Sequence, residues 1–172
     1  AQSAAGSEGC GMTLRLSFPL CVAFVGGVLF SHGPAAAQAA DKNEYVPQYP
    51  EDIEVEKDVE FLPGGRKERL DIYYPARSAG GGRVPAVVFF HGGGFNDGAK
   101  DRKREISVCS DLARAGYLAV SATYKLSRAK GQVTWPRNIH DCKLAVRWVR
   151  DNADRLGIDP DRIAVMGGSA GG

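Results

Sequence analysis

Three short apolar runs without polar alternation constrain the fold of this chain more than any other feature. They cover residues 84–90, 117–124 and 162–167. Strands that are covered on both faces read this way in parallel sheets, whereas half-exposed strands alternate apolar and polar residues. Two segments with a helical apolar period separate the runs, at about 102–115 and 138–156. The pattern therefore predicts a β-α-β-α-β unit with parallel strands and helices on both faces of the sheet.

The segment before this unit has a different period. Apolar residues recur at odd positions over 53–61 and at even positions over 70–74, with a Leu-Pro-Gly-Gly turn at 62–65. Alternation of this kind predicts two half-buried strands that pair as an antiparallel hairpin. The expected fold class is therefore α/β, with an antiparallel hairpin followed by a mostly parallel sheet.

Size and charge limit the remaining options. The chain has 172 residues, enough for one domain, and its 44% apolar and 24% charged residues are ordinary for a globular protein. A net charge of +2 gives no reason to expect a nucleic-acid partner. The dense basic run at 100–104 is expected to be a solvated loop and first helical turn.

The N-terminal region has the features of an export signal. One charge at Arg15 precedes an uncharged stretch over 16–30 and a small-residue stretch over 31–40 with A-x-A sites. A membrane anchor or a buried helix is the alternative, but a span needs about 20 apolar residues. We expect a signal peptide over 12–39, no assigned role for 1–11, no stable membrane insertion after cleavage, and a secreted or periplasmic domain over 40–172.

A G-x-S-x-G sequence, with Ser169 at its centre, follows the third apolar run directly. A serine on a tight strand-to-helix turn needs small neighbours, and the turn lifts its hydroxyl clear of the sheet. A plain or phosphate-binding Gly/Ser loop is the alternative, but the chain has neither a P-loop lysine after Gly172 nor G-x-G-x-x-G spacing. This context predicts that Ser169 is a catalytic nucleophile.

A second glycine cluster, His91-Gly-Gly-Gly94, follows the first apolar run. Backbone N–H groups that converge on one point stabilise the oxyanion of a tetrahedral intermediate, and glycines leave that point unobstructed. A flexible loop is the alternative interpretation. With Ser169 on a neighbouring strand, we expect Gly93, Gly94 and Ala170 to supply the donors of an oxyanion hole.

These motifs resemble the α/β-hydrolase superfamily and are most similar to its HGGG-type serine esterases, a group with hormone-sensitive-lipase-like members. A further likeness, to acetylxylan and feruloyl esterases, rests on Leu70-Asp-Ile-Tyr-Tyr-Pro75 and on the helix that carries Trp148. The likeness runs from about residue 54 to the end, which implies the N-terminal portion of an α/β-hydrolase fold. The segments that carry it are 91–95, 120–126, 159–162 and 167–172.

The resemblance implies residue roles and a reaction. Ser169 is the nucleophile, and His91 and Gly92 support the oxyanion loop. The acid and histidine of the triad follow the serine in this class and are not in this chain, so the chain alone is expected to be inactive. The full protein is expected to hydrolyse small esters or acylated carbohydrates, including acyl groups on plant polysaccharides, without a metal or organic cofactor. The oligomeric state stays open.

Two other functions share parts of this pattern. A peptidase of the prolyl-oligopeptidase type has the same strand-to-helix turn with its serine. It usually has a tyrosine-based oxyanion donor in place of the glycine cluster. A non-catalytic relative acting as a binding module often loses the serine or the glycines, and this chain keeps both. An esterase is therefore favoured over either alternative.

Four side chains carry further expectations. Asp141 shares the helical phase of the buried face, so it either pairs with Lys125 or lies at the rim in water. His140 shares the phase of charged residues and is expected to face solvent, without a catalytic role. Cys109 and Cys142 are expected on helices that cover opposite faces of the sheet, which places them too far apart for a disulfide.

Overall fold

One mixed sheet organises the part of the chain that the computed structural model describes, residues 45–76, 81–129 and 131–172. Its five strands lie in the order β1-β2-β4-β3-β5, where β1 pairs antiparallel with β2, and β2 with β4. Strands β4, β3 and β5 are mutually parallel. The predicted α/β class is thus confirmed, although the predicted signal peptide lies outside the described residues. In chain order the elements are β1 (Glu54–Val59), β2 (Leu70–Tyr74), β3 (Val84–Phe90), α1 (Lys103–Arg114), β4 (Leu118–Ala122), α2 (Arg137–Asp151), α3 (Ala153–Leu156), β5 (Ile158–Gly167) and the 3₁₀ turn η1 (Ser169–Gly171).

The register of the parallel strands brings distant parts of the sequence to one edge of the sheet. Phe90, the last residue of β3, pairs with Ala122 at the end of β4 and with Gly167 at the end of β5. The segments that follow β3 and β5 therefore start side by side. This is the edge at which open α/β sheets bind their ligands.

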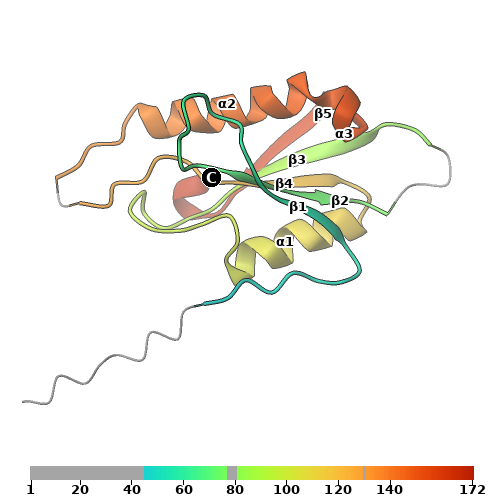
Figure 1. Ribbon diagram of the computed structural model, residues 1–172, viewed down its shortest axis with the longest axis horizontal. Helices are drawn as coiled ribbons and strands as arrows, with labels where there is room; N and C mark the ends of the chain where they lie inside the picture. The colour runs from blue at the N-terminus through green and yellow to red at the C-terminus, as the bar shows by residue number, and fades with distance from the viewer. Residues whose placement is uncertain (1–44, 77–80, 130) are drawn as a thin grey trace, which may run out of the picture. The chain divides into compact units, whose positions relative to one another are not determined.

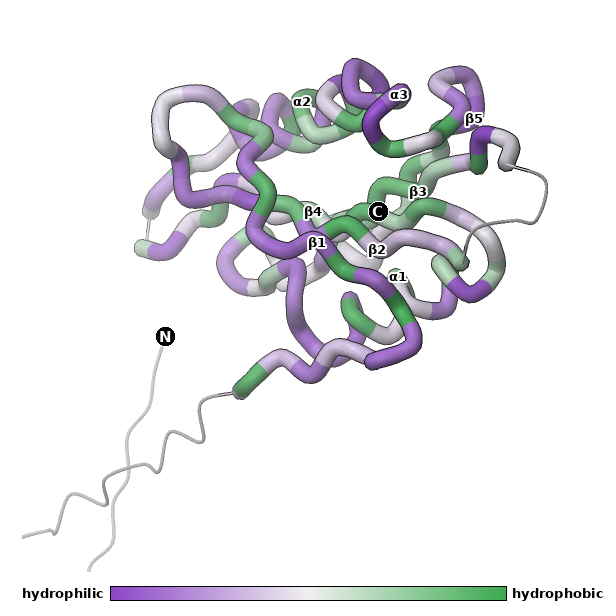
Figure 2. The backbone as a smooth tube through the Cα atoms, turned by 45° about the vertical axis from the view of Figure 1, so that its right-hand side comes forward, coloured by the Kyte–Doolittle hydropathy of each residue, from purple (hydrophilic) through white to green (hydrophobic). Residues whose placement is uncertain are grey.

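Helices cover both faces of the sheet (Figure 1). Helix α1 lies on one face, and α2 with α3 lies on the other. The larger core forms between the sheet and α2, and a smaller one forms under α1. In Figure 2 the tube is green along β3 and β4, between the helices, as expected for strands covered on both faces. Cys109 of α1 and Cys142 of α2 are both free, as predicted.

Two predicted elements differ in detail from the observed ones. The predicted helix over 138–156 is interrupted at Asn152, whose side-chain Nδ2 and backbone N both donate to the carbonyl of Trp148. The strand predicted over 162–167 begins earlier, at Ile158, and residues 159–161 form a bulge in it between the pairs Val84–Ile158 and Ala86–Ile163. There the Asp159 carboxylate accepts a hydrogen bond from the Asp161 N–H and closes the bulge.

Strand β5 forms an edge of the described sheet. Val165 and Met166 on this strand are exposed. Ile163 packs against the core beneath α2. Among the described residues no helix is both long and apolar enough to cross a bilayer.

Candidate active site

Ser169 lies on a sharp turn directly after β5. Its φ is +56°, in the left-handed region that non-glycine residues rarely adopt. The preceding Gly168 is extended, and the turn closes through hydrogen bonds from the N–H of Gly171 to the carbonyl of Gly168, 3.0 Å, and from Gly172 to Ser169, 3.0 Å. The Ser169 residue is exposed at the carboxyl edge of the sheet. The G-x-S-x-G pattern predicts this arrangement, a serine with a strained backbone whose side chain is accessible at the sheet edge.

Small neighbours make this turn possible. A Cβ added to Gly167 would overlap the carbonyl of Gly171, and one added to Gly171 would overlap the carbonyl of Phe90 in β3. The turn after β5 also touches the turn after β3, because a Cβ on Gly92 would come within 2.7 Å of Gly168 O and 3.4 Å of Ser169 Cβ. Glycine at these positions therefore lets the two strand ends meet.

The turn after β3, residues 91–98, is held by its own backbone. Gly93 has a φ of +120° and its carbonyl accepts hydrogen bonds from the N–H groups of Asn96 and Asp97, at 3.0 and 3.1 Å. Gly94 has a φ of +59°. Among the described residues the N–H groups of Gly93 and Gly94 donate to no partner. Two unused donors beside Ser169 are what an oxyanion hole requires.

His91 is buried at the base of this loop. Its ring stacks on Tyr124, with centroids 4.5 Å apart and an interplanar angle of 11°, and Nδ1 lies 2.7 Å from the carbonyl of Gly92. The Tyr124 hydroxyl donates to the carbonyl of His91 at 2.7 Å. Burial lowers the pKa of His91 below its ordinary value and favours the neutral ring. These contacts suit a residue that shapes the loop.

Three neighbours of the site were not predicted from the sequence. Gly98, at φ +113°, leaves room for His91, because a Cβ there would overlap its Nδ1. Tyr124 fixes the His91 carbonyl across the sheet edge. The guanidinium of Arg104 lies against the turn after β5, since a Cβ on Gly168 would come within 2.5 Å of Nη2 and 2.7 Å of Nη1. Of the three, only Gly98 could have been found from the sequence, because a glycine at the end of the 91–98 loop indicates a tight turn.

The basic run at 100–104 is not the uniformly solvated segment that its composition predicts. Lys100 is buried, and its Nζ lies 2.9 Å from carboxylate oxygens of both Asp58 and Asp71. Burial opposes the charge, but these carboxylates raise the pKa of Lys100 above its ordinary value. Asp71, fully buried in β2, also accepts a hydrogen bond from the Tyr49 hydroxyl at 2.7 Å. This network ties the segment after the glycine loop to the hairpin.

Asp141 is buried, and its charge partner is not the one predicted. Arg66, from the loop before β2, donates to both carboxylate oxygens at 2.6 and 2.7 Å. Lys125 contributes only its backbone N–H, at 3.0 Å. Asp141 therefore neither pairs with the Lys125 ammonium nor lies in water. Its partner is an arginine from the loop at 60–69, which the helical phase of Asp141 does not reveal.

The other candidates fall outside the site. His140 is exposed on α2, as expected. Over the described ranges, no group of three His, Cys, Asp or Glu side chains could hold a metal ion. Within those ranges the candidate site residues are Ser169, Ala170 and the His91–Gly94 loop.

Comparison with known proteins agrees with this architecture. The sheet order and the serine turn are those of the N-terminal portion of an α/β-hydrolase fold. The sequence matches the BD-FAE family over residues 70–172, and the chain belongs to that family. It is 38% identical over 114 residues to esterase LipQ of Mycobacterium tuberculosis, a match that covers 66% of this chain and 26% of that protein. It is 40% identical over 89 residues to carboxylesterase NlhH of the same species, covering 52% and 27%.

Solved structures give the same result. The thermostable carboxylesterase EstE1, cloned from a metagenomic library, is 37% identical with a TM-score of 0.60, over 72% of this chain and 39% of that one. Esterase 2 of Thermogutta terrifontis is 37% identical with a TM-score of 0.58, over 73% and 44%. That esterase is also known with propionate or butyrate bound, and phosphorylated by paraoxon. The chain spans about a quarter of the length of its curated relatives, 26% and 27% in these two matches.

Proposed function

We propose that the protein is a serine hydrolase that cleaves carboxylic esters through an acyl-enzyme on Ser169. One observation carries the proposal: an exposed serine at φ +56° lies against a glycine loop whose Gly93 and Gly94 N–H groups have no other described partner. Membership of a family with esterase relatives supports the same reaction.

The proposed reaction follows from this geometry. Ser169 Oγ attacks the acyl carbon and the carbonyl oxygen becomes an oxyanion, which the N–H groups of Gly93, Gly94 and Ala170 stabilise. The serine proton passes to a histidine and then to the leaving alcohol, and water hydrolyses the acyl-enzyme to release the acid. Neither described histidine fits this role, because His91 is buried against Tyr124 and His140 lies on the outer side of α2. In the order of the class, the acid and histidine follow Ser169.

The finer parts of the proposal concern substrate and location. Propionate and butyrate in structures of a relative support short acyl groups. We extend this to acyl groups on carbohydrates, including plant polysaccharides, and to a secreted or periplasmic protein exported by the signal over 12–39.

A substrate panel tests the proposal. Protein expressed from its complete gene is offered 4-nitrophenyl esters of acetate, butyrate and octanoate, acetylated xylan, and a prolyl peptide amide. We expect hydrolysis of the short esters and no hydrolysis of the amide. Turnover of the amide alone would instead identify a peptidase, and turnover of no substrate would identify a non-catalytic relative.

A further inference from the structure

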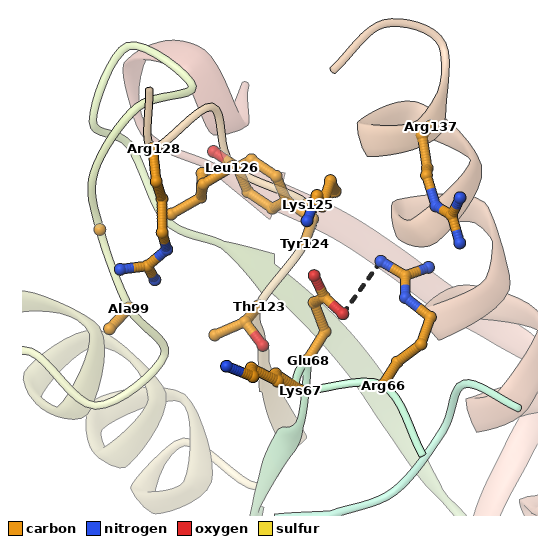
Figure 3. Close-up of a pocket in the computed structure, with 11 residues that line it drawn as sticks. Arg66, Lys67, Glu68, Ala99, Thr123, Tyr124, Lys125, Leu126, Arg128 and Arg137 are labelled. Carbon is orange, nitrogen blue, oxygen red and sulfur yellow. Dashed lines mark ion pairs between the residues drawn. The ribbon is translucent and has the colours of Figure 1, made fainter. Parts of the chain in front are cut away.

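A cavity of about 730 Å³ opens beside the site, within the size range of pockets that bind small molecules. Its walls come from the loop before β2, the segment after β4, the first residue of α2, and Gly98 with Ala99 of the glycine loop (Figure 3). Since β2 runs antiparallel to β4, the residues before β2 lie at the carboxyl end of β4. The cavity is therefore at the same sheet edge as Ser169.

The cavity is next to the oxyanion loop. Tyr124 lines it and also holds His91 by ring stacking and by its hydroxyl. The N–H of Ser127, next to the lining residue Leu126, donates to the carbonyl of Phe95 at 2.8 Å. A ligand in the cavity would therefore contact Tyr124, the residue that holds His91 at the base of the oxyanion loop.

Positive charge dominates the lining. Figure 3 shows cationic side chains from three segments around the cavity, with the carboxylate of Glu68 paired to Arg66. Arg66 also binds Asp141, so two carboxylates already neutralise it. The cations that remain are Lys67, Lys125, Arg128 and Arg137.

These remaining cations have no carboxylate within ion-pair distance among the described residues. Arg69, Arg83 and Arg155 hold carboxylates, whereas Arg104, Arg147 and Arg150 have none within ion-pair distance among the described residues. The four lining cations differ from these in gathering around one cavity. Arg137 is also the first residue of α2, whose first turn carries no acidic side chain, and a cation there opposes the helix dipole. Lys67, Arg128 and Arg137 are exposed and Lys125 is half-buried, so their charges are open to an anion that enters the cavity.

We infer that this cavity is a subsite for an anionic group, carboxylate or phosphate, on a sugar-sized part of the substrate. The inference rests on the proposed ester hydrolysis for its role in catalysis, although binding itself does not need the serine. Arg128 and Arg137 supply guanidinium groups that can each bind a carboxylate or phosphate through two hydrogen bonds. Lys67 and Lys125 add point charges. The ester bond of such a substrate then lies toward the Ser169 side of Tyr124.

Calorimetric titration tests the binding first. Glucuronate, glucose 6-phosphate and glucose are titrated into protein expressed from its complete gene. We expect at least one anion to bind about ten times more tightly than glucose, a difference of about 1.4 kcal/mol, with the advantage falling as salt is added. The ratio of the two anion affinities identifies carboxylate or phosphate as the preferred group.

A charge-matched pair of double variants locates the binding. Arg128→Gln with Arg137→Gln is expected to remove the advantage of the anion over glucose. Lys143→Gln with Arg147→Gln, on the exposed side of α2, removes the same charge outside the cavity and is expected to keep it. Thermal melting of both variants shows whether each is folded. Equal affinities for all three sugars, or equal loss in both double variants, would overturn the inference.

The catalytic arm separates this inference from the proposed function. The kcat/KM is compared for acetylated methyl glucuronoside and acetylated methyl glucoside. We expect the charged ester to be preferred about tenfold in the unmodified protein and in the Lys143 and Arg147 variant, but not in the Arg128 and Arg137 variant. Binding of glucuronate without hydrolysis of either ester would contradict the proposed function alone. Equal hydrolysis of both esters without anion binding would contradict the subsite alone.

Discussion

The two turns that build the site are held in different ways. The turn after β3 is anchored at its base, because His91 is buried, stacks on Tyr124 and has its carbonyl bound by the Tyr124 hydroxyl, whereas Gly93 and Gly94 are exposed. The turn after β5 closes by hydrogen bonds within residues 168–172, with Gly168 buried and Ser169 exposed. It meets the rest of the domain through a hydrogen bond from the Gly168 N–H to the Phe90 carbonyl at 3.4 Å and through close approach to Gly92 and Arg104.

The effects of substitutions on stability and on catalysis should therefore differ between the two turns. Changes to the anchored turn after β3 should lower stability and activity together, since packing of His91 and close backbone contacts fix its conformation. Changes to the exposed side chain of Ser169 should affect activity alone.

The largest expected effect is that of Ser169→Ala. Loss of a nucleophile in an acyl-enzyme mechanism lowers kcat by about 10⁴-fold or more. The side chain is exposed, so the free energy of unfolding should stay within about 0.5 kcal/mol of the unmodified protein. Turnover of 4-nitrophenyl butyrate and urea denaturation measure the two quantities. Retention of a tenth of the activity would assign the chemistry to another residue.

Gly93→Ala and Gly94→Ala form a matched pair within the turn after β3. A Cβ on Gly93 would overlap the backbone carbonyl of Asp97 at a φ of +120°, and we expect a loss of about 2–5 kcal/mol in stability. A Cβ on Gly94 meets nothing nearer than Asn96 Nδ2 at 3.9 Å. Only the left-handed backbone conformation then lowers the free energy of unfolding, by about 1–2 kcal/mol. Urea denaturation of both variants checks the order. Equal losses would mean that steric overlap does not fix this loop.

Tyr124→Phe removes the hydroxyl that caps His91. The buried carbonyl of His91 loses a 2.7 Å hydrogen bond, which should lower the free energy of unfolding by about 1–3 kcal/mol. Tyr117→Phe is the control, since that side chain is exposed and its hydroxyl has no described partner. Urea denaturation of the two variants gives the comparison. If Tyr124→Phe leaves the free energy of unfolding unchanged, the hydrogen bond to the His91 carbonyl does not stabilise the loop.

The smallest expected effect is on the pH dependence of stability. Burial lowers the folded-state pKa of His91 below the unfolded value of about 6.5. The stabilisation from the neutral ring is therefore complete above that pH and declines as the pH falls through it toward the folded-state pKa. Between pH 7.5 and 5.5 the unmodified protein and His140→Gln should lose more stability than His91→Gln. Equal losses in all three would show that His91 contributes nothing to this dependence.

The sequence predicted the elements that depend on local pattern. Apolar runs located β3, β4 and β5, and the glycine clusters after β3 and β5 became neighbours because parallel strands end at one edge. Gly116, expected to be left-handed after α1, has a φ of +91°.

Contacts between distant residues could not be predicted in the same way. The Tyr124 hydroxyl reaches a carbonyl 33 residues away, and Arg66 reaches Asp141 across 75 residues. Helical periodicity shows that Asp141 lies on the buried face of its helix. The loop that supplies its partner has no regular pattern of apolar residues from which the contact could be predicted. The buried Lys100 was missed for the same reason, since its partners Asp58 and Asp71 belong to the hairpin.

The central claim is that Ser169 is the residue that becomes acylated, and covalent labelling tests it directly. Paraoxon phosphorylates a relative of this chain and should transfer one diethylphosphoryl group to an activated serine. Protein expressed from its complete gene is treated with paraoxon, digested and analysed by mass spectrometry. The account predicts a single adduct on the peptide that contains Ser169 and none in the Ser169→Ala variant. An adduct on another residue, or labelling that survives in Ser169→Ala, would contradict it.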